Sequence, residues 1–421
     1  MPEDNNFHHA KYSRSDPANR VTYLTLEPGA APFSPAWKES LGVAGKTLHD
    51  SGVRLVLLLY GSYLGADLFG AGRLDAVGGL KRGYSRGIPG LESLLAMLRP
   101  GDYQKCREDE TLTPPFANDE ATKTRIDKCV KDHGNFSSEY QQGLQEALSS
   151  STLTPITCVR HLWSSRHHHL GRMEGALYLF HELMRLQREL HLTQDHRILI
   201  LAHGHAGQLT ALLSNLLGPE ESFVRGDLIE ALGQFYGQSD SPPPALTHLQ
   251  ELDQFLATNQ NQSFPALDVV TLGTAIRYGW NTSGIGKLLH LVNHRPLRSD
   301  GKRWLAKMDL PNIVMEMPAV MGGDYVQQLA VASTDAVPAT PLQEEFNQTL
   351  QENLEPYDGF ERWLECARRV TRCPNDGRCF LIDYQDAGEG SPAEHLYGHA
   401  CYTQLSTLLF QTRQIAKAFY S

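Results

Sequence analysis

The feature that most restricts the fold is a set of apolar runs of strand length. Residues 53–60 hold one charged side chain, Arg54, and the run ends at Gly61. A run without polar alternation is typical of a strand covered on both faces, as in a parallel sheet. Comparable runs lie at residues 197–202, 267–274, 327–332 and 379–384. We therefore expect strands at these positions.

Segments with helical spacing of apolar residues alternate with these runs. In residues 173–192, for example, Leu177, Phe180, Leu183 and Met184 fall on one helical face. Further helices are expected at residues 37–50, 206–217, 346–370 and 402–419. The alternation predicts an α/β fold, with a mostly parallel central sheet and helices on both faces.

The domain organisation follows from the segments that lack such patterns. Residues 1–50 are expected to form an N-terminal lead-in, loosely ordered before the helix at 37–50. Residues 51–421 then form one domain with two insertions. A polar, poorly packed insertion is expected at about 100–150, and a cap-like insertion at about 281–325, where no periodicity is evident. Residues 236–265 are interpreted as a polar connection.

Charge and hydropathy exclude several classes of partner. The formal net charge is −10, which gives nucleic acid or an anionic membrane surface no reason to bind. The first twenty residues carry no apolar core of the kind found in secretory signals. Residues 53–60 are far too few to cross a bilayer, which takes roughly 20 residues. We expect a cytoplasmic protein without a transmembrane segment.

The chain has seven cysteines, an odd number that cannot pair completely within one molecule. Cys373 and Cys379 flank a turn-rich loop, and Cys106 and Cys129 bracket a polar segment, so either pair could form a disulfide. Without a secretory signal, seven reduced thiols are favoured. There is no CxxC pair, and the consecutive histidines at 167–169 point in different directions. We therefore expect neither a metal nor a cofactor.

The most informative motif is Leu-Ile-Leu-Ala-His-Gly-His-Ala-Gly-Gln at residues 199–208. Small residues surround a sharp turn between a strand and a helix, where the two backbones come close. The segment resembles the nucleophile elbow, G-x-S-x-G, of the α/β-hydrolase superfamily. In this alignment Ala202 and Ala206 take the positions of the two glycines. Gly204 takes the position of the nucleophilic serine and has no side chain to attack with.

Three further segments resemble lipase- and esterase-like members of that superfamily. Residues 57–65 resemble the strand and oxyanion loop, with Tyr60 at the usual histidine position. Residues 270–274 are similar to the T-x-G-T-P strand end that follows the elbow, with Ala275 in place of the proline. Finally, His399 follows the last expected strand, where the family places its catalytic histidine.

The resemblance implies a site with a vacant nucleophile position at Gly204, an acid and a histidine base. His399 is the expected base and Asp335 the best candidate for the acid, with Asp383, Asp386 and Glu389 as alternatives. The expected binding residues are Tyr60, Gly61, Ser62, His203 and His205. Ser62, Ser164, Ser165 and Cys401 are alternative nucleophiles, although none lies on an elbow turn.

Two functions are compatible with this site. The first is a pseudohydrolase, a hydrolase-like scaffold that acts as a binding or assembly module. Its partner is either a small acyl or ester ligand or another protein. The second is an active carboxylic-ester or lipid hydrolase. In that case either the natural sequence carries serine at 204, or His399 and Asp335 activate water without a serine.

Overall fold

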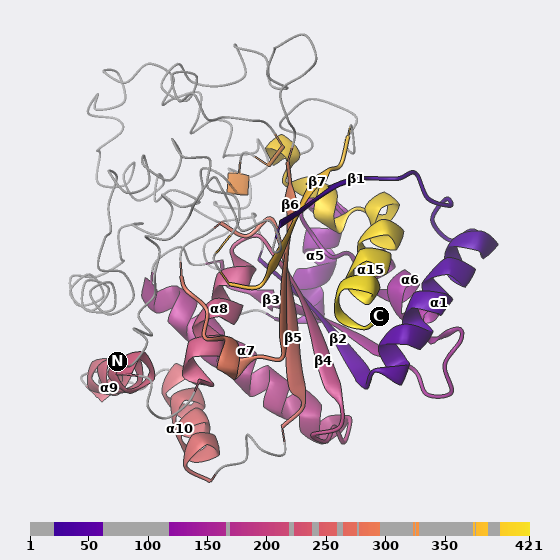
Figure 1. The fold of residues 1–421 in the computed structure, drawn as a ribbon. Coiled ribbons are helices and arrows are strands. Elements are labelled where there is room, and N and C mark those ends of the chain that lie inside the picture. Colours follow the sequence, from indigo (N-terminus) through magenta and orange to yellow (C-terminus); the bar gives the residue numbers. More distant parts are fainter. Residues whose placement is uncertain are drawn as a thin grey trace, which may run out of the picture.

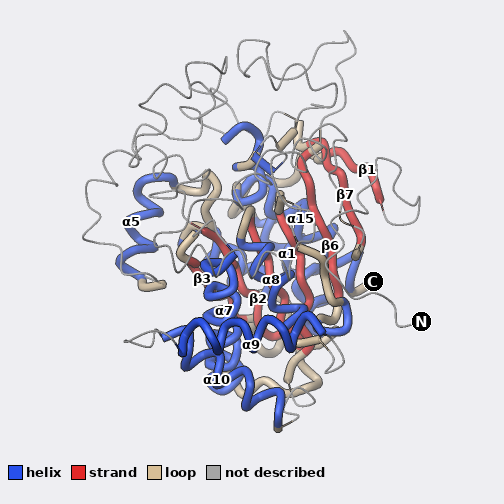
Figure 2. The backbone as a smooth tube through the Cα atoms, turned by 90° about the vertical axis from the view of Figure 1, so that its left-hand side faces the viewer, coloured by secondary structure: helices blue, strands red, loops and turns tan. Residues whose placement is uncertain are grey.

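The computed structural model describes a seven-stranded sheet in which every pair of neighbouring strands is parallel. The order across the sheet is β1-β7-β6-β5-β4-β2-β3, and Figure 2 shows β3 and β1 at opposite margins. The strands are β1 (Val21–Thr25), β2 (Val53–Gly61), β3 (Thr157–Trp163), β4 (Arg197–His203), β5 (Ala266–Leu272), β6 (Lys287–Asn293) and β7 (Arg378–Asp383). The structure describes residues 21–61, 118–165, 169–218, 223–237, 244–258, 264–275, 278–294, 323–324, 326–327, 374, 376–385 and 396–421.

Helices cover both faces of the sheet (Figure 1). One face carries α1 (Pro35–Asp50), α5 (Glu120–Val130), α6 (Ser138–Ser149) and α15 (Leu405–Phe419). The other face carries α7 (His169–Glu189), α8 (Ala206–Leu216), α9 (Phe223–Gly237) and α10 (Pro244–Ala257). Short 3-10 turns lie at η5 (Thr282–Gly284), η7 (Leu396–Gly398) and η8 (Ala400–Thr403).

The central strands form part of two hydrophobic cores, one on each face. In β4, Ile198 and Ile200 pack in the core beneath α7 and α8, whereas Leu199 and Leu201 pack in the core beneath α1 and α15. Successive side chains of a strand point to opposite faces, so a strand buried on both sides needs apolar residues at nearly every position. The apolar run of β4 meets this requirement.

The order of the strands fixes where a site can form. The chain passes from β2 to its neighbour β3 and then returns across β2 to β4, so its direction across the sheet reverses. Because crossover connections are right-handed, this reversal places α6 on one face and α7 on the other. In open parallel sheets, ligands bind at the carboxyl ends of the strands where the connections diverge in this way. Here that point lies between the ends of β2 and β4.

The fold class expected from the sequence is confirmed. The strands expected at 53–60, 197–202, 267–274 and 379–384 correspond to β2, β4, β5 and β7. Four of the expected helices correspond to α1, α7, α8 and α15, whereas the helix expected at 346–370 lies outside the described residues. The prediction of a strand at 327–332 is wrong at its first residue, because Gln327 lies in a helical turn. Residues 328–332 are not described.

Several segments differ from the expectation. Residues 21–25 form an edge strand of the sheet rather than a loose lead-in. In the range interpreted as a poorly packed insertion, α5 and α6 contribute Ile126, Tyr140 and Leu144 to the core. Residues 287–293, expected within a cap, form β6, an interior strand of the sheet, while 295–322 are not described. The polar connection at 236–265 contains the helix α10.

The cysteines also depart from the expected state. Cys129, Cys158 and Cys401 are free thiols, whereas Cys379 is disulfide-bonded to a residue outside the described part of the chain. The expectation of seven reduced thiols is therefore wrong at Cys379. Among the described helices, none combines the length and the apolar character that a membrane span requires.

Candidate functional site

The turn between β4 and α8 has the geometry of an elbow. Gly204 has a φ of +58°, in the left-handed region that favours glycine. Its amide donates to the carbonyl of Leu272 on β5, at 2.9 Å. Its carbonyl accepts hydrogen bonds from the Gly207 amide (3.1 Å) and from the Thr274 hydroxyl (2.8 Å). These bonds fix the tip of the turn between the last residue of a strand and the first turn of a helix.

Close packing of α8 explains why the turn contains small residues. A Cβ atom placed on Gly207 would lie 2.1 Å from the Thr274 hydroxyl oxygen, a distance that no real side chain reaches. Ala202 and Ala206 are both completely buried. The first N–H groups of a helix have no partner within it and favour negative charge. The turn therefore brings a bare α-carbon and a helix N-terminus together at the carboxyl edge of the sheet.

His399 lies beside this turn and forms a buried pair with Asp324. The imidazole Nδ1 and the carboxylate Oδ2 are 2.6 Å apart, and both side chains are almost completely buried. An ionised carboxylate only accepts hydrogen bonds, so Nδ1 carries the proton in this pair. The other ring nitrogen, Nε2, is then the basic one. This arrangement of histidine and carboxylate is the one used in general acid–base catalysis.

Asp324 is held by a set of hydrogen bonds from three elements. Its Oδ2 also accepts from the Tyr402 hydroxyl at 3.0 Å, and its Oδ1 accepts from the Gln327 amide at 2.7 Å. Its own amide donates to the carbonyl of Asn293, the last residue of β6, at 3.1 Å. A Cβ atom on Gly273 would lie 2.5 Å from the Asp324 carboxylate, so the glycine after β5 makes room for the acid.

His203, the last residue of β4, holds the backbone of His399 rather than its ring nitrogens. Its Nε2 donates to the carbonyl of His399 at 3.1 Å, and the two ring centroids are 4.4 Å apart. Burial lowers the pKa of His203 well below its usual value, and the neighbouring imidazole lowers it further. His203 is therefore neutral near pH 7. It acts as a positioning residue for His399.

The end of β2 forms the neighbouring wall. Tyr60 is completely buried, and its ring packs edge-on against Phe136, with the centroids 5.9 Å apart. Phe136 in turn lies 6.4 Å from the ring of His203. Burial raises the pKa of the Tyr60 phenol, which therefore stays protonated. Tyr60 is thus connected to the site through aromatic packing.

A small cavity of about 20 Å³ lies next to the first turn of α8, where Gly207 and Gln208 form part of its lining. Its lining includes Gln208, Thr274, Tyr278 and His290. A volume of this size holds about one water molecule. The cavity is too small for an acyl chain and is not the site proposed for a ligand.

The structure brings most of the residues expected from the sequence to one edge of the sheet. Gly204, His203 and the buried His205 form the elbow, His399 lies beside it, and Tyr60 and Gly61 end the neighbouring β2. Ser62 and Asp335 lie outside the described residues. Asp383 accepts a hydrogen bond from the Gln385 amide (2.8 Å), and Asp386 and Glu389 are not described.

The carboxylate that contacts His399 is Asp324, which was not among the expected residues. It follows β6, a strand that the apolar pattern of the sequence does not predict, so no predicted strand end points to this acid. The sequence Gly-Gly-Asp at 322–324 offers the only local signal, a glycine turn followed by an acid. Tyr402, the second donor to Asp324, lies at the start of the helix expected at 402–419, and no motif of the sequence indicates its role.

No protein-family model matches the chain, and neither a curated protein nor a solved structure matches it.

Proposed function

We propose that the chain is an α/β-hydrolase-like pseudohydrolase that binds a small acyl or ester ligand at the elbow without forming a covalent intermediate. The observation that carries this proposal is the position of Gly204 at the tip of the strand–turn–helix, with a φ of +58°. The α/β hydrolases place a strained serine there. Glycine offers no oxygen or sulfur, so an acyl–enzyme cannot form at this position.

The order of the other residues supports a hydrolase-like scaffold. In α/β hydrolases the nucleophile, the acid and the histidine follow one another along the chain. Gly204, Asp324 and His399 have this order and follow the strands β4, β6 and β7. The N-terminus of α8 provides amides suited to the carbonyl or carboxylate oxygen of a ligand.

The buried pair of His399 and Asp324 favours a second candidate, an ester hydrolase that works without a serine. In this mechanism Nε2 of His399 takes a proton from a water molecule as its oxygen attacks the ester carbonyl. Asp324 stabilises the imidazolium, which then gives the proton to the leaving alcohol oxygen. One ester and one water yield one acid and one alcohol. A binding role alone does not require the pair.

The two candidates are separated by assaying p-nitrophenyl esters of increasing acyl length with the native chain, Gly204→Ser and His399→Ala. We expect the native chain to bind p-nitrophenyl butyrate in calorimetry without turnover. Gly204→Ser should gain burst-phase hydrolysis if the remaining groups are competent. A serine at this φ costs about 1–2 kcal/mol, so thermal unfolding must verify that the variant is folded.

The outcomes assign the function clearly. Turnover by the native chain that His399→Ala abolishes would overturn the pseudohydrolase proposal and establish serine-independent hydrolysis. Turnover by Gly204→Ser alone would identify Gly204 as the only missing group. If neither binding nor turnover is found in any folded variant, the site does not recognise esters and the acyl-ligand proposal fails.

A cytoplasmic location and a protein partner stay predictions. The disulfide bond of Cys379 argues against a cytoplasmic location, because disulfides persist mainly in oxidising compartments. Labelling of free thiols in fractionated cells tests the location. A cytoplasmic protein would show Cys379 as reactive after denaturation without reductant.

A further inference from the structure

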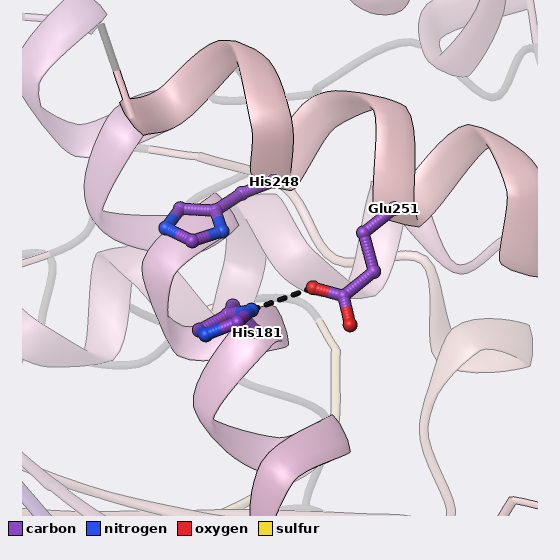
Figure 3. A group of neighbouring side chains, drawn as sticks. All are labelled: His181, His248 and Glu251. Carbon is purple, nitrogen blue, oxygen red and sulfur yellow. Dashed lines mark hydrogen bonds and ion pairs between the residues drawn. The ribbon is translucent and has the colours of Figure 1, made fainter.

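A second cluster of polar side chains lies on the helical layer formed by α7 and α10. His181 comes from α7, and His248 and Glu251 lie three residues apart on α10, as Figure 3 shows. Residues with this spacing share one face of a helix. One ligand-type atom from each of the three side chains lies within 4.8 Å of the other two. None of these residues belongs to the site at the carboxyl edge of the sheet.

Each oxygen of the Glu251 carboxylate has a partner in this structure. Oε2 of Glu251 is 2.6 Å from Nδ1 of His181, while Oε1 is 3.4 Å from the Arg188 guanidinium. Arg188 therefore contacts Oε1 of Glu251, while Oε2 faces His181. Outer partners of this kind orient the carboxylates that bind metal ions.

His248 provides the independent indication that the cluster accepts a ligand. Its side chain is 8% exposed, and its Nδ1 has no hydrogen-bonding partner among the described residues. Figure 3 shows its ring stacked over that of His181, with the nitrogen next to the attachment carbon turned toward Glu251. The ring centroids are 4.1 Å apart. A buried polar atom without a partner carries a free-energy penalty that a bound ion removes.

From this geometry we propose that His181, His248 and Glu251 bind a divalent transition-metal ion of the zinc class. Two imidazoles and one carboxylate are a common donor set for Zn²⁺. Ligand atoms around a tetrahedral zinc lie about 3.4 Å apart, given bond lengths near 2.05 Å. The separations in the cluster are at most 4.8 Å, so the longest must shorten by up to about 1.4 Å. Side-chain rotation can provide this, because the His181 side chain is 39% exposed and that of Glu251 is 24% exposed.

The bound ion connects α10 to α7 and keeps one coordination position open. Three protein ligands leave the fourth position of a tetrahedral site for water. Water can reach the cluster, because the His181 side chain is 39% exposed. Because the ion binds only when the two helices are packed together, it stabilises the folded chain by mass action.

The test is a titration of the full chain with Zn²⁺, after removal of metal by a chelator and dialysis, followed by calorimetry and thermal unfolding. We expect one tightly bound equivalent and a rise in Tm with Zn²⁺. The variants His181→Gln, His248→Gln and Glu251→Gln should each bind at least tenfold more weakly. Co²⁺ in place of Zn²⁺ should give visible absorption bands of low coordination number, which these variants lose.

The matched control is His133→Gln. The His133 side chain is 40% exposed and its Nδ1 is 3.5 Å from the Asp132 carboxylate, so it resembles His181 in exposure and in having an acidic neighbour. We expect this variant to bind zinc as the native chain does. Equal affinity in all four variants would overturn the proposal, because another histidine group would then hold the ion. Absence of a stoichiometric site in the native chain would overturn it as well. His181→Gln, at a half-exposed position, keeps the test valid if His248→Gln fails to fold.

Discussion

The Tyr402 hydroxyl satisfies two buried polar groups of different elements. It donates to the Asp324 carboxylate at 3.0 Å and accepts the amide of Asn293 at 2.7 Å. Burial raises the pKa of this phenol well above its usual value, and the Asp324 charge adds to the effect. The group therefore stays protonated and able to donate. One oxygen atom thus connects the end of β6 to the acid of the candidate site.

Tyr402→Phe should lower the free energy of unfolding by about 1–3 kcal/mol. The ring still fills its space, but the amide of Asn293 and the Asp324 carboxylate each lose a buried partner. Urea unfolding of the native chain and the variant measures the difference. Tyr23→Phe is the control, since the Tyr23 side chain is 70% exposed and its loss of a hydroxyl should change stability by less than about 0.5 kcal/mol. Equal stability of all three proteins would show that water replaces the Tyr402 hydroxyl.

The sequence indicated the residues of the site that lie in local motifs and missed the one that does not. Gly204 and His399 could be found because a small-residue turn follows one apolar run and a histidine follows another. Asp324 lies 31 positions beyond Asn293, the end of β6. Its role arises only when an antiparallel bridge between His294 and Gly323 returns the chain to the sheet. No periodicity in the sequence reports such a bridge.

At the scale of elements, the approach of α8 to the sheet depends on Gly207. Gly207→Ala should destabilise the fold by about 1–3 kcal/mol, because the new methyl group would overlap Thr274 and push the helix away. Chemical denaturation measures the effect. Gly233→Ala in α9 is the matched control. A Cβ atom there meets nothing within 4 Å, so the higher helix propensity of alanine should stabilise the protein by about 0.5–1 kcal/mol. Destabilisation of equal size in both variants would contradict this account.

A buried ion pair fastens α5 to the edge strand β3. Nη1 of Arg160 lies 2.9 and 2.8 Å from the two carboxylate oxygens of Asp127, and the Arg160 side chain is 3% exposed. Asp127→Ala should cost about 3–5 kcal/mol, because it leaves a buried guanidinium without its main counter-charge. Glu120→Gln, which removes the 76% exposed second partner of Arg160, should cost less than about 1 kcal/mol. Thermal and urea unfolding of the two variants measure these costs. A similarly small loss of stability in both variants would show that Arg160 reaches solvent.

Two of the missed strands, β3 and β6, carry polar residues inside the apolar run. In β3, Arg160 and His161 interrupt the pattern, yet both are buried because Asp127 and Asn118 pair with them. In β6, His290 is buried through a hydrogen bond to the Thr271 hydroxyl, at 2.7 Å. Their partners lie on other elements, so the pattern along the chain does not by itself predict a strand at either place. The continuous runs of β2 and β4 need no such partners and could be recognised directly.

At the scale of the whole molecule, buried neutral histidines make the fold sensitive to acid. Burial lowers the pKa of His161 to about 4, and that of His203 lies well below its usual value for the same reason. The histidine pKa in an unfolded chain is about 6.5. Above pH 6.5 these imidazoles are neutral in both the folded and the unfolded chain, and their burial then carries no protonation penalty. As the pH falls from 6.5 toward the folded pKa, only the unfolded chain takes up protons, so stability is lost.

We therefore expect the free energy of unfolding in urea to be lower at pH 5.0 than at pH 7.5, with His161 alone contributing about 2 kcal/mol of the difference. His161→Gln should reduce the difference by about that amount, because glutamine binds no proton in either state. His191→Gln should leave it unchanged, since that side chain is exposed to solvent in the folded chain as well. A pH dependence that His161→Gln does not alter would mean that water reaches the imidazole of His161 in the folded protein. The acid sensitivity would then come from His203, from His248, whose pKa burial lowers to about 4, and from the carboxylates.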